Sequence, residues 1–488
     1  MSSAPSHKPP QDQPPLNLLV PVTPGKQKAV GVPVAHASHP GGNGAGPNQN
    51  LPPKIPPPAS PLYFLKPGIV WSFVKRQPLS YWFVCIYLFF EYVRPQDLYP
   101  AISGLPYAFI AILAALASII FERRKLRFGL AEVMLGIFTF IVIASSFTAY
   151  QPAAAYEKLD IYISWLVIYF IIANAVDTEE RFIVFMLSFL IYSFKMSQHV
   201  TFDWAREGFG FRSWGAVGGP GWLHNSGEFG VQMCIFLPLM ISFIVGLGPY
   251  WSRITRVVWW LAMSTILIGI VASSSRGALL ALPIIGLWVV MRSRYRLRAF
   301  MATLALAAAT YALIPAEQKA RLDSMGDDNT SVSRTTYWKN GLTILDEHKV
   351  LGIGYANWPE YYENTYNLRA LPHNIFIQAA AELGYSGLFA FFGLIGCTFL
   401  INARSRKMAR ARQDGGRFIV QMAYGIDGAL LGFLASGFFV TVLYYPFFWN
   451  NLAMAVALQN AAINSRPPRK VLMQLRVVPA RARTQANS

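Results

Sequence analysis

The sequence predicts an all-α polytopic membrane protein with about twelve transmembrane helices. Apolar residues make up 54% of the 488 residues and charged residues only 14%, against about 25% charged residues in an ordinary soluble domain. The apolar residues fall in long uncharged blocks, such as 101–121 and 277–291. Because only a helix satisfies its own backbone hydrogen bonds in lipid, blocks of this length indicate membrane spans. The composition excludes a soluble enzyme and a secreted disulfide scaffold.

The first segment of the chain is predicted to be disordered. Residues 1–60 hold 15 of the 33 prolines and no aromatic residue. Such a segment cannot bury enough apolar surface to offset the entropy of ordering it. It also lacks the apolar stretch of a signal peptide. We therefore expect a Pro-rich cytoplasmic tail at 1–60, a transmembrane domain at 61–464 and a basic cytoplasmic tail at 465–488.

The domain between the tails contains the apolar blocks in a regular series. They lie near residues 79–93, 101–121, 128–148, 161–176, 181–196, 227–247, 257–274, 277–291, 299–314, 374–402, 418–440 and 447–463. A further stretch at 62–73 is a candidate for an interfacial segment.

Clusters of basic residues indicate how these spans are oriented. They follow even-numbered spans throughout, at 123–127, 253–256, 292–298, 404–417 and 466–470. Lys and Arg accumulate in cytoplasmic loops, so both termini are expected in the cytoplasm. The formal net charge of +18 therefore reports membrane orientation, and no nucleic-acid partner is expected.

Three longer stretches then face outward, at 149–160, 197–226 and 315–373. The last is the largest and carries most of the acidic residues among them. Within it, 332–347 has apolar residues at the spacing of an amphipathic helix. A loop of this length with structure of its own is usually functional.

Arg276 lies where two spans meet on the outer side, which opposes the positive-inside bias. Arginine in an apolar context is costly near the bilayer core. Its forked donors, beside the hydroxyls of 273–275, suit a membrane-surface anion such as a lipid pyrophosphate. The alternative is a snorkelling arginine in a tight turn.

His373 is the candidate base, because it lies where the large outer stretch enters the tenth span. The ordinary pKa of histidine is near neutrality, so the imidazole could take a proton from a hydroxyl at physiological pH. Asn374 and Glu382 follow it and are candidate substrate contacts. Under the alternative, Asn374 or His373 merely caps the helix and Glu382 is a buried polar contact.

Two more outward arginines are candidates for binding an anionic substrate. Arg212 precedes the sixth span, and Arg334 begins the predicted helix of the large loop. Either could instead pair with a loop carboxylate in a weak surface ion pair. The sequence shows no Asp-x-Asp pair and no His/Cys ligand spacing, so neither a metal nor another cofactor is expected.

Together these motifs resemble the O-antigen ligase and O-antigen polymerase superfamily. The resemblance rests on Ser275-Arg276-Gly277-Ala278, on Arg334 and Trp338 followed by Gly352-x-Gly354, and on His373-Asn374-x-x-x-Gln378 leading to Glu382-x-Gly384. Arg212-x-x-Gly215 with Asn225 is similar to a further element of the family. The segment 91–100 resembles the branch of O-glycosylation ligases associated with exosortase systems. The resemblance covers roughly 79–463.

The resemblance implies a glycosyltransferase of the bacterial inner membrane that needs no metal. Such an enzyme takes a glycan from undecaprenyl pyrophosphate at the periplasmic face and transfers it, with inversion, to a hydroxyl of a lipid, protein or glycan acceptor. By this resemblance His373 is the general base, and Arg276, Arg212 and Arg334 contact the pyrophosphate or the glycan.

Two other functions stay open at this point. A polymerase of the same superfamily uses the same donor and differs only in its acceptor. A transporter or flippase of lipid-linked glycans would instead require charges near the bilayer midplane and repeated halves. The charges considered above lie at the outer ends of spans, which favours an enzyme built at one face.

Overall fold

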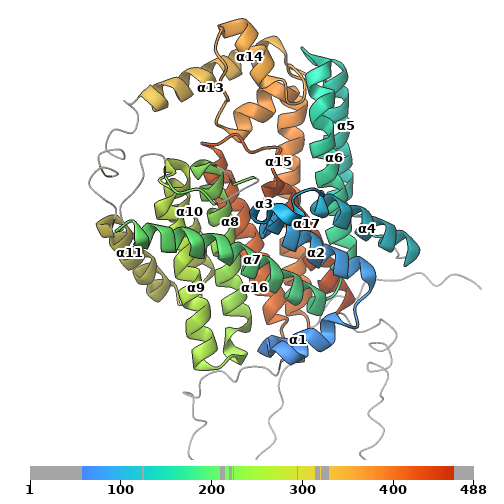
Figure 1. Cartoon of the computed structure of the whole chain (residues 1–488), viewed down its shortest axis with the longest axis vertical. Coiled ribbons are helices and arrows are strands. Elements are labelled where there is room, and N and C mark those ends of the chain that lie inside the picture. Colours follow the sequence, from blue (N-terminus) through green and yellow to red (C-terminus); the bar gives the residue numbers. More distant parts are fainter. Residues whose placement is uncertain are drawn as a thin grey trace, which may run out of the picture. The chain divides into compact units, whose positions relative to one another are not determined.

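The computed structural model describes residues 58–465, apart from 124–125, 209–214, 219–221, 224, 294, 314–318 and 320–328. These residues belong to one compact unit, Ile55–Ser488. Every regular element among them is a helix, which confirms the all-α prediction (Figure 1). The two predicted tails lie almost wholly outside the described residues.

A helix overlaps each apolar block of the sequence. These helices are α2 (Leu79–Tyr92), α4 (Tyr107–Phe121), α5 (Leu130–Phe147), α6 (Pro152–Ala175), α7 (Glu179–Arg206), α8 (Ser226–Leu247), α9 (Arg253–Ala272), α10 (Arg276–Arg292), α11 (Arg296–Leu313), α15 (Ile375–Arg410), α16 (Arg417–Gly437) and α17 (Pro446–Asn464). The other elements are η1 (Pro61–Phe64), α1 (Pro67–Val74), α3 (Pro95–Leu98), η2 (Pro100–Ile102), η3 (Gly248–Tyr250), α13 (Asn329–Glu347) and α14 (Trp358–Tyr366). The interfacial stretch and the amphipathic helix of the sequence correspond to α1 and α13.

Eight of these segments are long and apolar enough to cross a membrane, which makes the chain a multi-pass membrane protein. They contain α4 to α9, α15 and α16. The predicted number of about twelve is not confirmed, because α2, α10, α11 and α17 are not among the eight. Helix α2 has 14 residues, which span roughly 21 Å at 1.5 Å per residue. Helix α17 carries three buried asparagines, Asn450, Asn451 and Asn460, and lies inside the protein.

Some helices extend well beyond their apolar blocks, α6 and α7 the furthest. Helix α6 begins at Pro152, so most of the predicted outward stretch 149–160 is helical. Helix α7 continues to Arg206, ten residues past its block. The reason is that hydropathy marks the part of a helix in contact with lipid or the core. Polar turns that continue the helix into water carry no such signal.

Helices α8 and α16 form the centre of the bundle (Figure 1). In the most apolar window of α8, 89% of the residues are buried, the highest share of the eight candidate spans. The two helices approach closely because glycines of α16 face α8. A Cβ on Gly428 would lie 2.8 Å from Cβ of Pro238, and one on Gly425 would lie 2.6 Å from Cβ of Ser242. Small residues at such contacts are typical of membrane helix packing.

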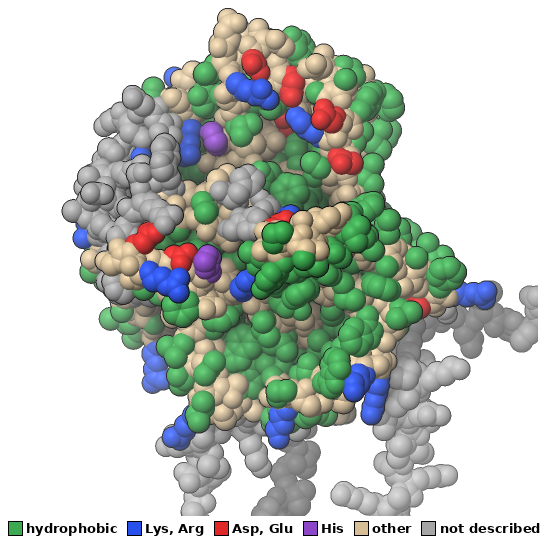
Figure 2. Space-filling model, viewed as in Figure 1, with side chains coloured by type: hydrophobic (Ala, Val, Ile, Leu, Met, Phe, Trp, Pro, Cys, Tyr) green, Lys and Arg blue, Asp and Glu red, His purple; other side chains and the backbone are tan. Residues whose placement is uncertain are grey.

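Several of the described basic residues between the helices lie at one end of the bundle, which we call the basic end. Arg412 pairs with Glu179 at the start of α7, and Arg417 donates to the Val245 carbonyl at 2.9 Å. Arg127 donates to Asn464 at the end of α17. Helices α13 and α14 pack on the first part of α15 at the opposite end (Figure 1). Figure 2 shows Lys and Arg side chains along the lower edge of the view, below a largely apolar surface.

Candidate functional site

His373 lies at the end of the segment that connects α14 to α15. Its φ of 46° is in the left-handed region, which is uncommon for residues other than glycine. The backbone N–H of His373 donates to Oγ1 of Thr441 at 2.9 Å. The next residue, Asn374, is the N-cap of α15, and its Oδ1 accepts from the N–H groups of Phe376 and Ile377 at 2.8 and 3.1 Å. These contacts hold the backbone of His373 in its unusual conformation.

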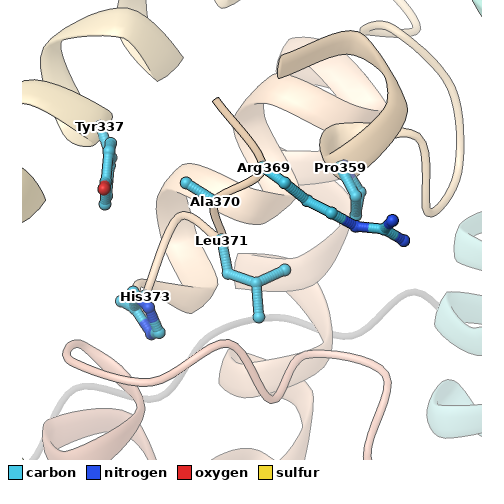
Figure 3. Close-up of a pocket in the computed structure, with 6 residues that line it drawn as sticks. All are labelled: Tyr337, Pro359, Arg369, Ala370, Leu371 and His373. Atoms are coloured by element: carbon cyan, nitrogen blue, oxygen red, sulfur yellow. The ribbon is translucent and has the colours of Figure 1, made fainter. Parts of the chain in front are cut away.

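The side chain of His373 lines an open pocket of about 540 Å³ (Figure 3). The lining residues are Tyr337, Pro359, Arg369, Ala370, Leu371 and His373. Figure 3 shows the hydroxyl of Tyr337 pointing down from α13, on the side of the pocket where His373 lies, while Arg369 extends away from both. The pocket therefore joins three parts of the outer region: α13, α14 and the segment before α15.

Arg334 lies on the same side of the site and acts on the charge of His373. Burial and the Arg334 guanidinium together lower the pKa of His373 from 6.5 to about 4. The imidazole is therefore neutral at pH 7 and can accept a proton. Trp338, one turn after Arg334 on α13, donates from Nε1 to the Pro372 carbonyl at 3.0 Å. That bond ties the helix that carries Arg334 to the residue before His373.

Residues 438–445, between α16 and α17, contact His373, α13 and α8; we call this segment the α16–α17 connection. Its Thr441 holds the backbone of His373. The rings of Phe438 and Phe439 lie 5.2 and 6.2 Å from that of Trp338. The hydroxyl of Tyr445 donates to Glu228 Oε1, in the first turn of α8, at 2.7 Å.

Arg276 is the first residue of α10, whose N-terminus packs against the same connection. Ser275 is the N-cap, and its hydroxyl accepts from the N–H of Ala278 at 3.4 Å. A Cβ on Gly277 would lie 3.0 Å from Cβ of Phe439 and from the Ser436 carbonyl. Glycine thus lets the start of α10 come close to the connection that positions His373. The helix N-terminus and the guanidinium together favour an anion here.

Arg212 lies outside the described residues, but the residues after it are placed beside Arg276. Ala216 donates its N–H to the Ala272 carbonyl at 2.8 Å. A Cβ on Gly215 would lie 2.0 Å from the Ser273 carbonyl oxygen, so only glycine fits at this position. The segment that follows Arg212 therefore contacts the turn that leads into Arg276.

Asn374 and Glu382 make buried contacts within the protein. Asn374 uses its Oδ1 for the helix cap, which is the alternative left open by the sequence. Glu382 is 1% exposed; its Oε1 accepts from the N–H of Trp358 at 3.1 Å and its Oε2 from Nε2 of Gln378 at 3.3 Å. Glu382 thereby caps the N-terminus of α14, which begins at Trp358. Within the described residues, no group of three or more His, Cys, Asp or Glu side chains could hold a metal ion.

The part of the chain that contains this arrangement matches a known family. Residues 261–392 match the family model described as O-Antigen ligase. This part of the chain is similar to O-antigen ligases, and we call it the O-antigen ligase domain. The matched segment includes Arg276, Arg334, His373, Asn374 and Glu382. The domain indicates a ligase-type enzyme that transfers a glycan and works in a membrane with a lipid-linked donor.

A second match lies nearer the N-terminus. Residues 66–201, from the start of α1 into α7, match a family of unknown function (DUF5935). No curated protein matches the chain. The resemblance of the segment 91–100 to the exosortase-associated branch is not confirmed by either match and stays a prediction.

Helix α15 of the O-antigen ligase domain is broken at Gly384, and glycine permits the backbone conformation of the break. Gly384 has φ 66° and ψ −167°, which interrupts α15 after its first turns. The Ala381 and Glu382 carbonyls before the break accept the N–H groups of Ile353 and Gly354 at 2.9 and 3.0 Å. The Gly352-x-Gly354 motif of the sequence thus supplies the donors that the broken helix lacks. The predicted span 374–402 contains this break, which the apolar pattern does not mark.

Sequence reasoning missed two side chains that lie beside the candidate general base, His373. Thr441 is 68 residues from His373 in the chain, and nothing in its local sequence marks it. The sequence marks Tyr337 only as one of the apolar positions of the predicted helix 332–347, and not as a residue of the site. The neighbouring Arg334 and Trp338 were the available signal that this helix faces the site.

Proposed function

We propose that this protein transfers a glycan from undecaprenyl pyrophosphate to an acceptor hydroxyl at the periplasmic face of a bacterial inner membrane. The observation that carries the proposal is a neutral imidazole, His373, that lines an open pocket and is close enough to the Arg334 guanidinium for that charge to lower its pKa. A base with a cation nearby suits a reaction between a neutral hydroxyl and an anionic donor.

In the proposed reaction, His373 takes the proton of the acceptor hydroxyl as its oxygen attacks the anomeric carbon. The bond between that carbon and the pyrophosphate oxygen breaks on the opposite face, which inverts the configuration. The electron pair leaves with the lipid pyrophosphate. Arg334 and Arg276 stabilise the charge that develops on this leaving group, through charge-assisted hydrogen bonds.

Binding of the donor also tunes the base. Burial and, after it, the positive charge of Arg334 keep the pKa of His373 low. A pyrophosphate beside Arg334 counters that charge, so the pKa of His373 rises towards the pH of the periplasm. The base is then strongest when the donor is in place.

The orientation rests on the distribution of charge between the two ends of the bundle. Arg127, Arg412 and Arg417 lie at the basic end, away from His373 and α13. By the positive-inside rule the basic end faces the cytoplasm, with both termini. The pocket then faces the periplasm, where the large stretch 315–373 was expected.

The other candidate residues take different parts in this proposal. Arg212 is a further contact for the donor, because the chain after it lies against the turn before Arg276. Asn374 and Glu382 are positioning residues, since their oxygens are bonded to α15 and α14. The acceptor decides whether the enzyme acts as a ligase or as a polymerase, and the O-antigen ligase match supports the ligase.

The decisive experiment is a transfer assay with purified protein in detergent. The protein is incubated with an undecaprenyl pyrophosphate-linked glycan and candidate acceptors, in the presence of EDTA. The expected result is a glycosylated acceptor from the parent. His373→Ala should reduce turnover by about a hundred- to ten-thousand-fold, because that is the usual contribution of a general base.

The matched control is His348→Ala, which changes an exposed histidine of the same outer region. It should leave turnover within twofold of the parent. A folded His373→Ala protein that transfers glycan within a fewfold of the parent rate would show that His373 is not the base.

A further inference from the structure

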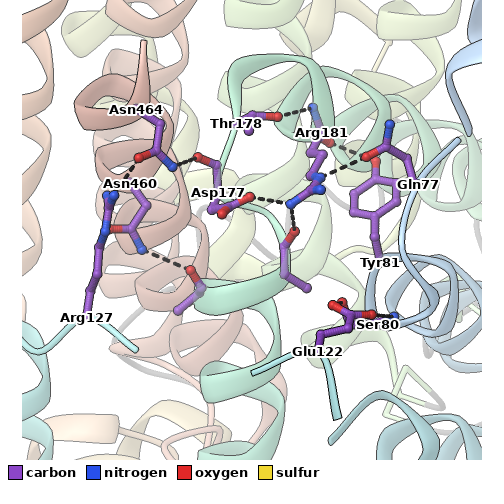
Figure 4. Close-up of polar contacts among 12 residues, drawn as sticks. Gln77, Ser80, Tyr81, Glu122, Arg127, Asp177, Thr178, Arg181, Asn460 and Asn464 are labelled. Carbon is purple, nitrogen blue, oxygen red and sulfur yellow. Dashed lines mark hydrogen bonds and ion pairs between the residues drawn. The ribbon is translucent and has the colours of Figure 1, made fainter. Parts of the chain in front are cut away.

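A second polar pocket lies at the basic end of the protein, opposite His373 and independent of the proposed transfer. It has a volume of about 710 Å³. Its lining residues are Arg76, Gln77, Pro78, Glu122, Arg127, Asn174, Asp177, Arg181 and Asn464. These residues lie at or next to the start of α2, the ends of α4 and α6, the starts of α5 and α7 and the end of α17. Figure 4 labels several of them, among them Gln77, Glu122 and Arg181.

The pocket lies at the level where membrane spans end. Glu122 directly follows the candidate span that ends at Phe121, and Asn174 is one residue from the end of α6. Arg127 precedes the start of α5 by three residues. A pocket bounded by the ends of three candidate spans opens at the boundary between hydrocarbon and water, where lipid headgroups lie.

The arginines of the pocket differ in how their charge is compensated. Arg181 pairs with Asp177 at 2.5 Å (Figure 4). Arg127 donates to the neutral amides of Asn464 and Asn460. Within the described residues neither Arg127 nor the exposed Arg76 is paired with a carboxylate. Two guanidinium groups therefore bring uncompensated positive charge to one pocket.

The carboxylate of Glu122 is engaged in a helix cap. It accepts from the backbone N–H of Ser80 at 3.0 Å and from the Ser80 hydroxyl at 2.7 Å, at the start of α2 (Figure 4). It is thereby directed towards α2. The three arginines of the pocket outnumber its two carboxylates, so the net charge offered to a ligand is positive.

Large apolar side chains surround the pocket and are exposed. Phe121 and Phe128, on either side of the 122–127 turn, are 85% and 80% exposed, and Leu79 is 64% exposed. Trp71 of α1 is also exposed, with Nζ of Lys75 5.0 Å from its ring centroid. Aromatic residues beside basic ones are typical of the membrane interface. These side chains offer contacts for acyl chains next to the polar pocket.

We propose that this pocket binds the phosphate headgroup of an anionic membrane phospholipid, with its acyl chains against Phe121, Phe128 and Leu79. The phosphate accepts hydrogen bonds from Arg76 and Arg127. Basic pockets between membrane helices on the cytoplasmic side suit such headgroups. The bound lipid joins the part of the chain before α7 to the last helix, α17.

The test is native mass spectrometry of the full chain in detergent, with phosphatidylglycerol added at increasing concentration. Phosphatidylcholine and sodium phosphate are the two comparison ligands. The expected result is saturable binding of phosphatidylglycerol, at least about tenfold tighter than phosphatidylcholine, because the uncompensated arginines favour net negative charge. Equal binding of both lipids would overturn the proposal. Binding of sodium phosphate as tight as that of the lipid would assign the site to free phosphate and also overturn it.

The variants are Arg76→Gln, at an exposed position that should not disturb folding, and Arg76→Gln with Arg127→Gln. The double variant should bind phosphatidylglycerol about tenfold more weakly or worse, since each basic residue near the surface contributes to attraction of anionic lipid. The matched control is Arg253→Gln with Arg296→Gln, which removes the same charge from exposed positions at the basic end outside the pocket. If the control and the double variant lose the same affinity for phosphatidylglycerol, the loss is caused by overall charge, and the proposed site is refuted.

Discussion

The ionisation of His373 depends on its burial and on one neighbouring cation. Burial first, and the Arg334 guanidinium after it, lower the pKa of His373 to about 4. A base must be neutral to act, and His373 is neutral above that pKa. The parent kcat/KM should therefore stay level as the pH falls from 7 to about 5, and decrease only as it approaches 4. An ordinary histidine would lose activity already near pH 6.5.

Arg334→Gln should shift the decrease of kcat/KM at low pH, which we call the acid limb, to higher pH. Without the guanidinium the imidazolium form is less disfavoured, so the pKa of His373 rises towards its ordinary value. As the pH is lowered, kcat/KM of the variant then begins to fall at a higher pH than in the parent. Its maximal kcat/KM is also lower. Arg334→Lys keeps the charge and should keep the limb where it is. An unchanged limb in Arg334→Gln would show that the charge of Arg334 does not act on the base.

Arg276 should not be replaceable by lysine. Arg276→Lys keeps the charge but loses the fork of donors that can bind two pyrophosphate oxygens at once. Turnover should fall by about tenfold or more, because a charge-assisted hydrogen bond to the leaving group is lost. Arg253→Lys, on an exposed arginine at the basic end, serves as the control. Near-normal turnover of Arg276→Lys would favour the snorkelling arginine.

At the scale of elements, the break in α15 organises the outer region. Gly384 allows the helix to change direction, and the freed carbonyls bind the segment after α13. Glu382, just before the break, caps α14. The first turns of α15 thus hold α14, which lines the His373 pocket, and the segment that follows α13. A continuous helix at this position would leave neither the free carbonyl acceptors nor the space for the segment 349–354.

Gly384→Ala should destabilise the protein. Its φ and ψ belong to a region that is essentially restricted to glycine, and the new Cβ would lie 2.4 Å from the Val350 carbonyl oxygen. The cost is of order 1–3 kcal/mol or more, measured as a lower temperature of thermal unfolding in detergent.

Gly396→Ala is the matched control for this experiment. Gly396 lies in the regular part of the same helix, and its Cβ would meet no atom within 4 Å. Alanine should therefore raise stability there by about 0.5–1 kcal/mol. Equal effects of the two substitutions would show that the break at Gly384 is not required.

At the scale of the whole molecule, the two ends of the bundle differ in charge and in task. The basic end holds the phosphate pocket, and the opposite end holds His373. Tags placed after residue 410 and after Arg466 should be cytoplasmic, and a tag near residue 325 periplasmic, because basic loops stay inside. Accessibility to a membrane-impermeant reagent in spheroplasts measures this. Protection of the tag near residue 325 would overturn both the orientation and the location of the site.

The sequence by itself determined the all-α architecture, the position of each long helix and the residues proposed for the chemistry. These depend on local properties: apolar blocks of membrane length, clusters of Lys and Arg, and Arg276, Arg334 and His373 in short motifs. The amphipathic spacing of 332–347 also predicted α13, because helical period is a property of consecutive residues.

The tertiary structure alone decided what each polar residue does. Thr441 holds His373 across 68 residues, and Glu382 is directed to α14 across 24 residues. The break at Gly384 became apparent only with its partners Ile353 and Gly354 in place. The physical reason is that hydropathy and spacing describe how a segment meets lipid, water or its own next turn. Which oxygen accepts which distant N–H is set by how the helices pack, and that packing is not written in any local pattern.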